Sequence, residues 1–213
     1  MRFTAPSERR STTVAPQASA LSLCPADLDM PILFVPGLHG SGPVHWQTHW
    51  QRQIPGARRI AHQDWQNPDV YAWTQAVVRA TYAMPQAPMI IAHSFGCLAV
   101  VCAGYAGARI RAALLVAPAD PERFGIGADL AGKPLPFAST MVASSNDPWL
   151  KLIRAGTLAS AWGSRFVLYR NAGHINAESG FGPWPQGLTH VQELAHRAAH
   201  GHSSELTTRP LTN

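Results

Sequence analysis

Short runs of consecutive apolar residues alternate along this chain with longer segments whose apolar residues recur at helical spacing. The short runs, bounded by Pro, Gly or polar residues, predict β-strands, and the longer segments predict helices. Strands are expected at residues 31–35, 88–92, 111–117, 137–144 and 165–170, with a less apolar one at 57–62, and helices at 44–53, 69–83, 94–106, 148–161 and 188–199. Apolar strands that alternate with helices are typical of parallel sheets covered on both faces. The pattern therefore predicts an α/β fold, a three-layer sandwich around a mostly parallel sheet of about six strands.

The two ends of the chain differ from this pattern. Residues 1–29 are rich in Ser, Thr, Ala, Pro and Arg, lack periodicity and contain no continuous apolar segment of the kind a secretory signal needs. We expect them to form a disordered extension, and Met30, after which the ordered pattern begins, is a candidate for the true start of the protein. Residues 30–199 then form one domain, followed by a polar C-terminal tail at 200–213.

Composition narrows the class of protein and of partner. Of 213 residues, 46% are hydrophobic and 14% charged, which excludes a charge-driven disordered chain and argues against a long coiled coil. The net charge is +5, but the basic residues are scattered, so neither nucleic acid nor a membrane is an expected partner. No apolar run reaches the roughly 18 residues that a membrane-spanning helix requires. Three cysteines without CxxC spacing are typical of a reducing compartment, and a cytoplasmic location is expected.

The sequence AHSFG at residues 92–96 carries the strongest chemical signal. It joins an expected strand directly to an expected helix, the context in which a serine lies on a sharp turn and presents its hydroxyl as a nucleophile. Ser94 is therefore the candidate nucleophile. The backbone N–H of Phe95, at the start of the helix, is expected to be one donor of an oxyanion hole. Ala92 stands where glycine is usual and leaves slightly less room in the turn.

A glycine-rich loop, PGLHGSG at residues 36–42, follows the first expected strand. In a hydrolytic site a loop at this place supplies the second backbone N–H of the oxyanion hole, which we assign to Leu38. Such a loop can also cradle a phosphate. The GxGxxG and Walker spacings are both missing from it, which disfavours nucleotide binding.

A serine hydroxyl needs a base to take up its proton. Five histidines follow Ser94, and four of them belong to the last expected helix or to the tail, where exposure to solvent is the ordinary role. His174 instead lies in the loop NAGHIN, directly after the last expected strand, at the edge where open α/β sheets place their sites. His174 is therefore the candidate base.

The base in turn needs a carboxylate that holds its tautomer, and in this architecture the chain order is serine, acid, histidine. Asp147 follows the expected strand 137–144, one strand before His174, and is the favoured candidate. Asp120, after the expected strand 111–117, is the reserve. Each aspartate precedes a proline, so either could instead serve only as a helix cap.

Four motifs together resemble the α/β-hydrolase superfamily: PGLHGSGPVHWQTHW, AHSFG, SSNDPW and NAGHIN. Within it, they are similar to the compact serine hydrolase family that includes retinoblastoma-binding protein 9 and the bacterial YdeN-like proteins. The resemblance covers about residues 30–199. It implies an α/β-hydrolase domain with a triad of Ser94, Asp147 and His174 and with no cofactor. Ala92 departs from the family's usual glycine.

His39, His45, Trp46 and Trp149 lie close in sequence to these loops and are candidates for lining a substrate pocket. His45 and His49 are also spaced i, i+4, as zinc-binding histidines on a helix are. No carboxylate or cysteine stands nearby to complete a metal site with them, so no metal is expected.

These residues predict hydrolysis of a small-molecule ester or related acyl compound through an acyl-enzyme. The segment 118–136 is short and leaves little room for a large lid, which favours a small, open pocket and a small acyl substrate. The alternative is a non-catalytic protein-binding module on the same fold. The choice among ester, thioester and amide, and the oligomeric state, stay open at the level of sequence.

Overall fold

The computed structural model describes residues 28, 30–62 and 64–200. The predicted extension and tail therefore lie outside the described residues, apart from Leu28 and His200. Leu28 is buried in the core. The sheet has six strands, all pairing in parallel, in the order β2-β1-β3-β4-β5-β6. The strands are β1 Ile32–Val35, β2 Arg58–Arg59, β3 Met89–His93, β4 Ala112–Val116, β5 Ala138–Ser144 and β6 Arg165–Tyr169.

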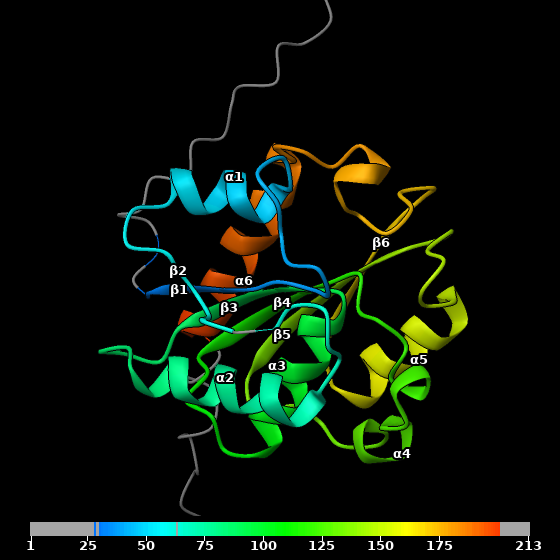
Figure 1. Ribbon diagram of the computed structural model, residues 1–213, viewed down its shortest axis with the longest axis horizontal. Coiled ribbons are helices and arrows are strands. Elements are labelled where there is room, and N and C mark those ends of the chain that lie inside the picture. The colour runs from blue at the N-terminus through cyan, green and yellow to red at the C-terminus, as the bar shows by residue number, and fades with distance from the viewer. Residues whose placement is uncertain (1–27, 29, 63, 201–213) are drawn as a thin grey trace, which may run out of the picture.

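Helices cover both faces of this sheet (Figure 1). One face carries α1 and α6, and the other carries α2, α3 and α5, which confirms the predicted three-layer α/β fold. The helices are α1 Trp46–Gln53, α2 Val70–Tyr82, α3 Phe95–Tyr105, α4 Gly127–Leu130, α5 Leu152–Ala161 and α6 Leu188–His200. In the part of the chain that the structure describes, none of the helices has the length and apolar character to cross a membrane.

The apolar runs of the sequence supply two core clusters, one on each face of the sheet. Successive side chains of a strand point to opposite faces. Along β1, Leu33 and Val35 pack on the side of α2 and α3, whereas Ile32 and Phe34 pack on the side of α1 and α6. A strand buried on both faces is apolar at most positions, which is why β1, β3 and β4 read as nearly continuous apolar runs.

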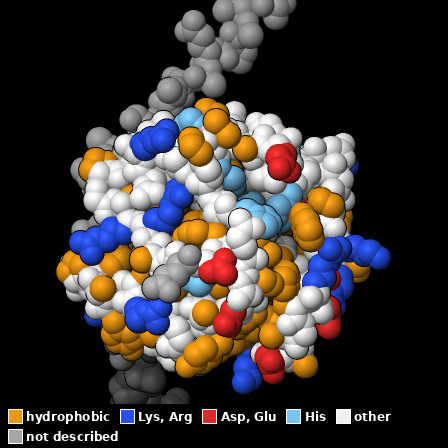
Figure 2. Space-filling view, in the orientation of Figure 1, with side chains coloured by type: hydrophobic (Ala, Val, Ile, Leu, Met, Phe, Trp, Pro, Cys, Tyr) orange, Lys and Arg blue, Asp and Glu red, His pale blue; other side chains and the backbone are white. Residues whose placement is uncertain are grey.

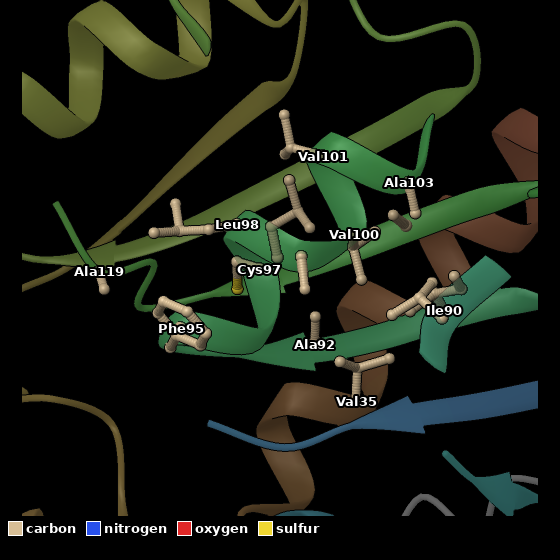
Figure 3. Packing of buried hydrophobic residues seen from close by; sticks show 14 of the residues in the cluster. Val35, Ile90, Ala92, Phe95, Cys97, Leu98, Val100, Val101, Ala103 and Ala119 are labelled. Atoms are coloured by element: carbon tan, nitrogen blue, oxygen red, sulfur yellow. The ribbon is translucent and has the colours of Figure 1, made fainter. Parts of the chain in front are cut away.

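Helix α3 lies in the middle of one cluster (Figure 3). Its residues are small or apolar on every side, as in a helix enclosed by a core, and it packs between the sheet and α2. Ala92, which replaces the usual glycine before the turn, is fully buried on β3 beneath this helix. Its methyl group is therefore part of the core.

Several elements differ from their predictions. The strand expected at 57–62 shrinks to β2, two residues at the sheet edge that pair only with β1. Helix α5 begins at Leu152 because Asp147 accepts the N–H of Trp149 at 2.9 Å, and the chain makes a turn there before the helix can start. Two short helical segments, a 3₁₀ turn at Pro121–Phe124 and α4, occupy the segment where none was predicted.

The strand order locates the crevice of the fold. After β1 the chain forms β2 on one side of it, then returns to form β3 on its other side. The loops that leave β1 and β3 therefore diverge, and ligands of open α/β sheets bind at this divergence, beyond the carboxyl ends of the strands.

Candidate active site

Ser94 lies on the turn between β3 and α3, as the AHSFG motif predicts. Its backbone has φ 53° and ψ −126°, a strained conformation that few residues other than glycine adopt. Gly96 makes the turn possible, because a Cβ there would lie 2.1 Å from the carbonyl oxygen of Pro36. The turn projects the Ser94 side chain beyond the carboxyl edge of the sheet.

The side chains of Ser94, His174 and Asp147 form one continuous chain of hydrogen bonds. The Nε2 atom of His174 lies 2.8 Å from Ser94 Oγ, and its Nδ1 atom lies 2.9 and 3.0 Å from the two carboxylate oxygens of Asp147. A carboxylate only accepts, so Nδ1 carries the proton and Nε2 accepts from the serine hydroxyl. The His174 and Asp147 side chains are 9% and 3% exposed, which shields this chain from water.

Asp120, the reserve acid, takes no part in this chain. Its carboxylate accepts two hydrogen bonds from Arg154, at 2.7 and 3.0 Å, and a third from the backbone N–H of Glu122 at 3.1 Å. These contacts cap the 3₁₀ turn at Pro121–Phe124 and tie it to α5. The structure thus places Asp147, and not Asp120, against His174.

Two polar residues that sequence reasoning missed fasten the acid loop to the histidine loop. Asn146 Oδ1 accepts hydrogen bonds from the N–H of Gly173 and from the hydroxyl of Ser144, both at 2.8 Å. Ser144 Oγ also accepts the N–H of Ala172 at 3.0 Å. Their only signal in the sequence was their place in the SSNDPW motif, within three residues of Asp147.

The two backbone N–H groups assigned to the oxyanion hole belong to residues that line the same cavity as Ser94. Phe95 is the first residue of α3, where an N–H has no carbonyl partner within the helix and the helix dipole favours negative charge. Leu38 follows β1 in a loop that passes very close to the nucleophile, since a Cβ on Gly37 would lie 2.7 Å from Ser94 Cβ.

A cavity of about 450 Å³ opens over Ser94. Figure 2 shows histidine side chains gathered around a hollow on this face of the molecule. Three of the four predicted pocket residues, His39, His45 and Trp149, line the cavity. The remaining lining residues come mainly from the loops after β1, β3, β4 and β6: Leu38, Gly40, Gly42, Val44, His93, Ser94, Phe95, Ala119, Phe124, His174, Asn176, Ala177 and Glu178.

The prediction that Trp46 lines the pocket is wrong. Its side chain is fully buried beneath the site, packed against Trp50 and Trp184. Its indole Nε1–H donates a 2.8 Å hydrogen bond to the carbonyl oxygen of Ile175. Trp46 therefore supports the histidine loop from below and does not touch the cavity.

His45 caps helix α1 at the edge of the cavity. Its Nδ1 atom accepts the backbone N–H of Gln47 at 3.2 Å, which requires an unprotonated nitrogen. Burial lowers the pKa of His45 to about 4, with smaller contributions from Arg59 and His174. The ring is therefore neutral at neutral pH and keeps its capping role.

Lowering the pH from 8 to 5 is expected to reduce the free energy of unfolding by about 2 kcal/mol through His45 alone. An unfolded histidine takes up a proton near pH 6.5, whereas folded His45 does so only near pH 4, so the unfolded state binds more protons between these values. Urea unfolding at both pH values measures the loss. His45→Asn keeps a capping side chain without a titratable group and should lose about 2 kcal/mol less. Equal losses in the two proteins would contradict the prediction.

Among residues 28, 30–62 and 64–200, no group of three or more His, Cys, Asp or Glu side chains is arranged to hold a metal ion. In particular, His39, His45 and His49 do not form such a group, although His45 and His49 have the i, i+4 spacing of zinc-binding histidines. His45 uses Nδ1 as the cap of α1, and His39 Nδ1 pairs with Gln66 at 3.1 Å.

Comparison with known proteins places this chain in a family. A family model described as serine hydrolase matches residues 32–193. The structure of a YdeN-like hydrolase from Pectobacterium atrosepticum is 38% identical with a TM-score of 0.78, and the match covers 81% of this chain and 95% of that chain. The search of curated proteins found no match.

More distant structures share the fold. The ydeN gene product of B. subtilis is 15% identical with a TM-score of 0.62, covering 78% of this chain and 98% of that chain. An esterase domain from Rhodothermus marinus is 15% identical with a TM-score of 0.56, covering 77% of this chain and 87% of that chain. The resemblance to YdeN-like proteins that the sequence motifs indicated is thereby confirmed. This chain belongs to the serine hydrolase family of the α/β-hydrolase superfamily, and it is a hydrolase.

Proposed function

We propose that this hydrolase cleaves a small ester or related acyl compound through an acyl-enzyme, with Ser94 as nucleophile, His174 as base and Asp147 as the acid that orients it. The observation that carries the proposal is the unbroken chain of hydrogen bonds from Ser94 Oγ through His174 to Asp147 at the floor of a cavity. A serine becomes a strong nucleophile when an oriented base is within hydrogen-bonding distance.

The first half of the reaction transfers the acyl group to the enzyme. Ser94 Oγ attacks the carbonyl carbon while its proton passes to His174 Nε2. The negative charge that develops on the carbonyl oxygen is held by the N–H groups of Leu38 and Phe95, each contributing about 3–4 kcal/mol to the stability of the transition state by analogy with measured oxyanion holes. The imidazolium, stabilised by Asp147, then protonates the leaving oxygen as the carbon–oxygen bond breaks.

The second half releases the acid. A water molecule gives a proton to His174 Nε2 and attacks the acyl carbon, and the bond between this carbon and Ser94 Oγ breaks. The proton returns to Ser94, so the enzyme is restored and the net reaction consumes one water. The same sequence of steps applies to thioesters and amides, which differ only in the leaving group.

The cavity supports a small substrate. Its volume, about 450 Å³, lies toward the lower end of the roughly 300–1,000 Å³ that small-molecule sites occupy. Phe124 of the 3₁₀ turn packs edge-to-face on Phe95, with ring centroids 4.7 Å apart, and forms one wall. Trp149 forms part of another wall at 47% exposure, so the mouth of the cavity is open to solvent.

Labelling with a fluorophosphonate probe tests the proposal, because this reagent reacts with activated serines. We expect intact mass to show one label on the wild-type protein, none on Ser94→Ala, and one on Ser160→Ala, which replaces an exposed serine of α5. If the folded wild-type protein takes up no label, the enzymatic proposal is wrong and a non-catalytic binding module becomes the better account.

A panel of esters and thioesters with acyl chains of increasing length then tests the substrate class. We expect kcat/KM to be highest for short chains and to fall once the chain outgrows the space bounded by Phe124 and Trp149. A preference for long chains would contradict the small-substrate proposal without affecting the assignment of Ser94.

A further inference from the structure

His93 is a buried histidine that the hydrolytic steps leave without a role. It is the last residue of β3 and directly precedes Ser94. Its Nε2 atom lies 3.0 Å from the backbone carbonyl oxygen of His174. A carbonyl oxygen only accepts, so Nε2 carries the proton and donates it to this hydrogen bond. His93, the neighbour of the proposed nucleophile Ser94, thus donates a hydrogen bond to the backbone of His174, the proposed base.

The loop that His93 contacts is held in a strained conformation. Both neighbours of His174 have positive φ, 55° at Gly173 and 48° at Ile175. A β-branched residue such as Ile175 rarely adopts this region, and surrounding contacts must hold it there. Trp46 donates to the carbonyl of Ile175 and His93 donates to the carbonyl of His174, so side chains from α1 and β3 hold two consecutive carbonyls.

The surroundings of His93 keep its ring neutral. Burial lowers the pKa of His93 well below its ordinary value, and the rings of His174 and His45 lower it further. The three rings are close, since the centroid of His93 lies 4.9 Å from that of His45 and 4.9 Å from that of His174. A neutral His93 has one N–H to donate, and it adds no charge beside the imidazolium that His174 becomes during turnover.

We propose that His93 is a positioning residue, whose hydrogen bond to the His174 carbonyl sets the distance between the base and Ser94. Because His93 and Ser94 share a peptide unit, this bond ties the backbone of the nucleophile to the backbone of the base. An error of 1 Å in the placement of a reacting group can cost about 100-fold in rate. The inference rests on the proposed function, in which His174 takes the proton of Ser94.

Two substitutions separate the hydrogen bond from the bulk of the ring. His93→Leu removes the donor and keeps an apolar side chain of moderate size. His93→Gln places an amide N–H about as far from the backbone as Nε2 is. With a short ester, we expect His93→Leu to lower kcat about 100-fold with KM changed less than about threefold, and His93→Gln to recover at least about tenfold of the loss. The rate of fluorophosphonate labelling of Ser94 should follow the same order.

Thr81→Val is the matched control for a lost buried hydrogen bond. The Thr81 hydroxyl is buried in α2 and donates to the carbonyl of Val78 at 2.8 Å, away from the site. We expect this variant to lose stability and to keep the kcat of the wild-type protein. Urea unfolding gives the free energy of unfolding of every variant. Comparing it with kcat shows whether activity falls with stability or only when the His93 hydrogen bond is lost.

The outcomes distinguish the inference from the function on which it rests. If wild-type Ser94 takes up no label, the proposed function fails. If wild-type Ser94 is labelled but His93→Leu keeps its kcat, or His93→Gln loses as much as His93→Leu at equal stability, His93 is only a core histidine and the inference is wrong. Should His93→Leu not fold, His93→Asn, whose amide is too short to reach the carbonyl, replaces it and is expected to label more slowly than His93→Gln.

Discussion

Replacing His174 by alanine is expected to lower kcat for a short ester by about 10⁴- to 10⁶-fold. The imidazole takes the proton of Ser94 through a 2.8 Å contact and later returns it to the leaving group, and no other described side chain is hydrogen-bonded to Ser94 Oγ. Steady-state kinetics with a chromogenic ester measure the loss. Activity above the uncatalysed rate should persist, because the oxyanion hole and the cavity still act on the substrate.

His190→Ala is the matched control for this change. His190 is a half-buried histidine of α6 that pairs with the hydroxyl of Tyr169 at 3.0 Å and does not line the cavity. We expect kcat of this variant to stay within about twofold of the wild-type value, because His190 touches neither the cavity nor the triad. If His174→Ala retains a tenth or more of the wild-type kcat, the assignment of His174 as the base is wrong.

Replacing Asp147 by asparagine is expected to lower kcat about 10⁴-fold while leaving the fold intact. Both carboxylate oxygens accept hydrogen bonds from the Nδ1–H of His174, which keeps the proton on Nδ1 and leaves Nε2 free to accept from Ser94. An amide can instead donate to Nδ1, which favours the tautomer whose Nε2 carries a proton and cannot act as a base. Kinetics together with circular dichroism of the variant separate this effect from misfolding.

Asp120→Asn provides the contrast, because the sequence left both aspartates as candidates. The variant weakens the pair with Arg154 at the 3₁₀ turn, and we expect a loss of at most about 1 kcal/mol in the free energy of unfolding with kcat nearly unchanged. The reverse result, with a large loss of kcat in Asp120→Asn and little in Asp147→Asn, would show that the acid has been misassigned.

Most of the candidate site could be predicted because its signals are local. A serine between an apolar strand and an apolar helix, and a histidine just after the last strand, are each recognisable from a few neighbouring residues. The carboxyl ends of parallel strands share one edge of a sheet, so the loops that carry Ser94, the two candidate aspartates and His174 had to lie at one edge once the fold was α/β. The prediction that the backbone N–H of Leu38 belongs to the oxyanion hole follows from the same argument, applied to the loop after β1.

The errors and omissions concern residues whose role depends on distant neighbours. Trp46 lies close to a site loop in the sequence, but its buried ring points inward to the carbonyl of Ile175, which is 129 residues away. His93 and Asn146 went unnoticed because their partners are backbone groups of the histidine loop, and a backbone group leaves no mark in a sequence. The late start of α5 has a local cause instead, the turn in which Asp147 accepts a hydrogen bond from the backbone N–H of Trp149.

The sequence by itself determined the three-layer α/β fold, the resemblance to serine hydrolases and the loops that carry the candidate triad, because apolar periodicity and short motifs are properties of neighbouring residues. The tertiary structure alone decided that Asp147 and not Asp120 meets His174, that Trp46 lies beneath the cavity, and that His93 holds the histidine loop. Each of these depends on a distance of about 3 Å between residues far apart in the chain. Only the packing of the loops against one another sets such distances.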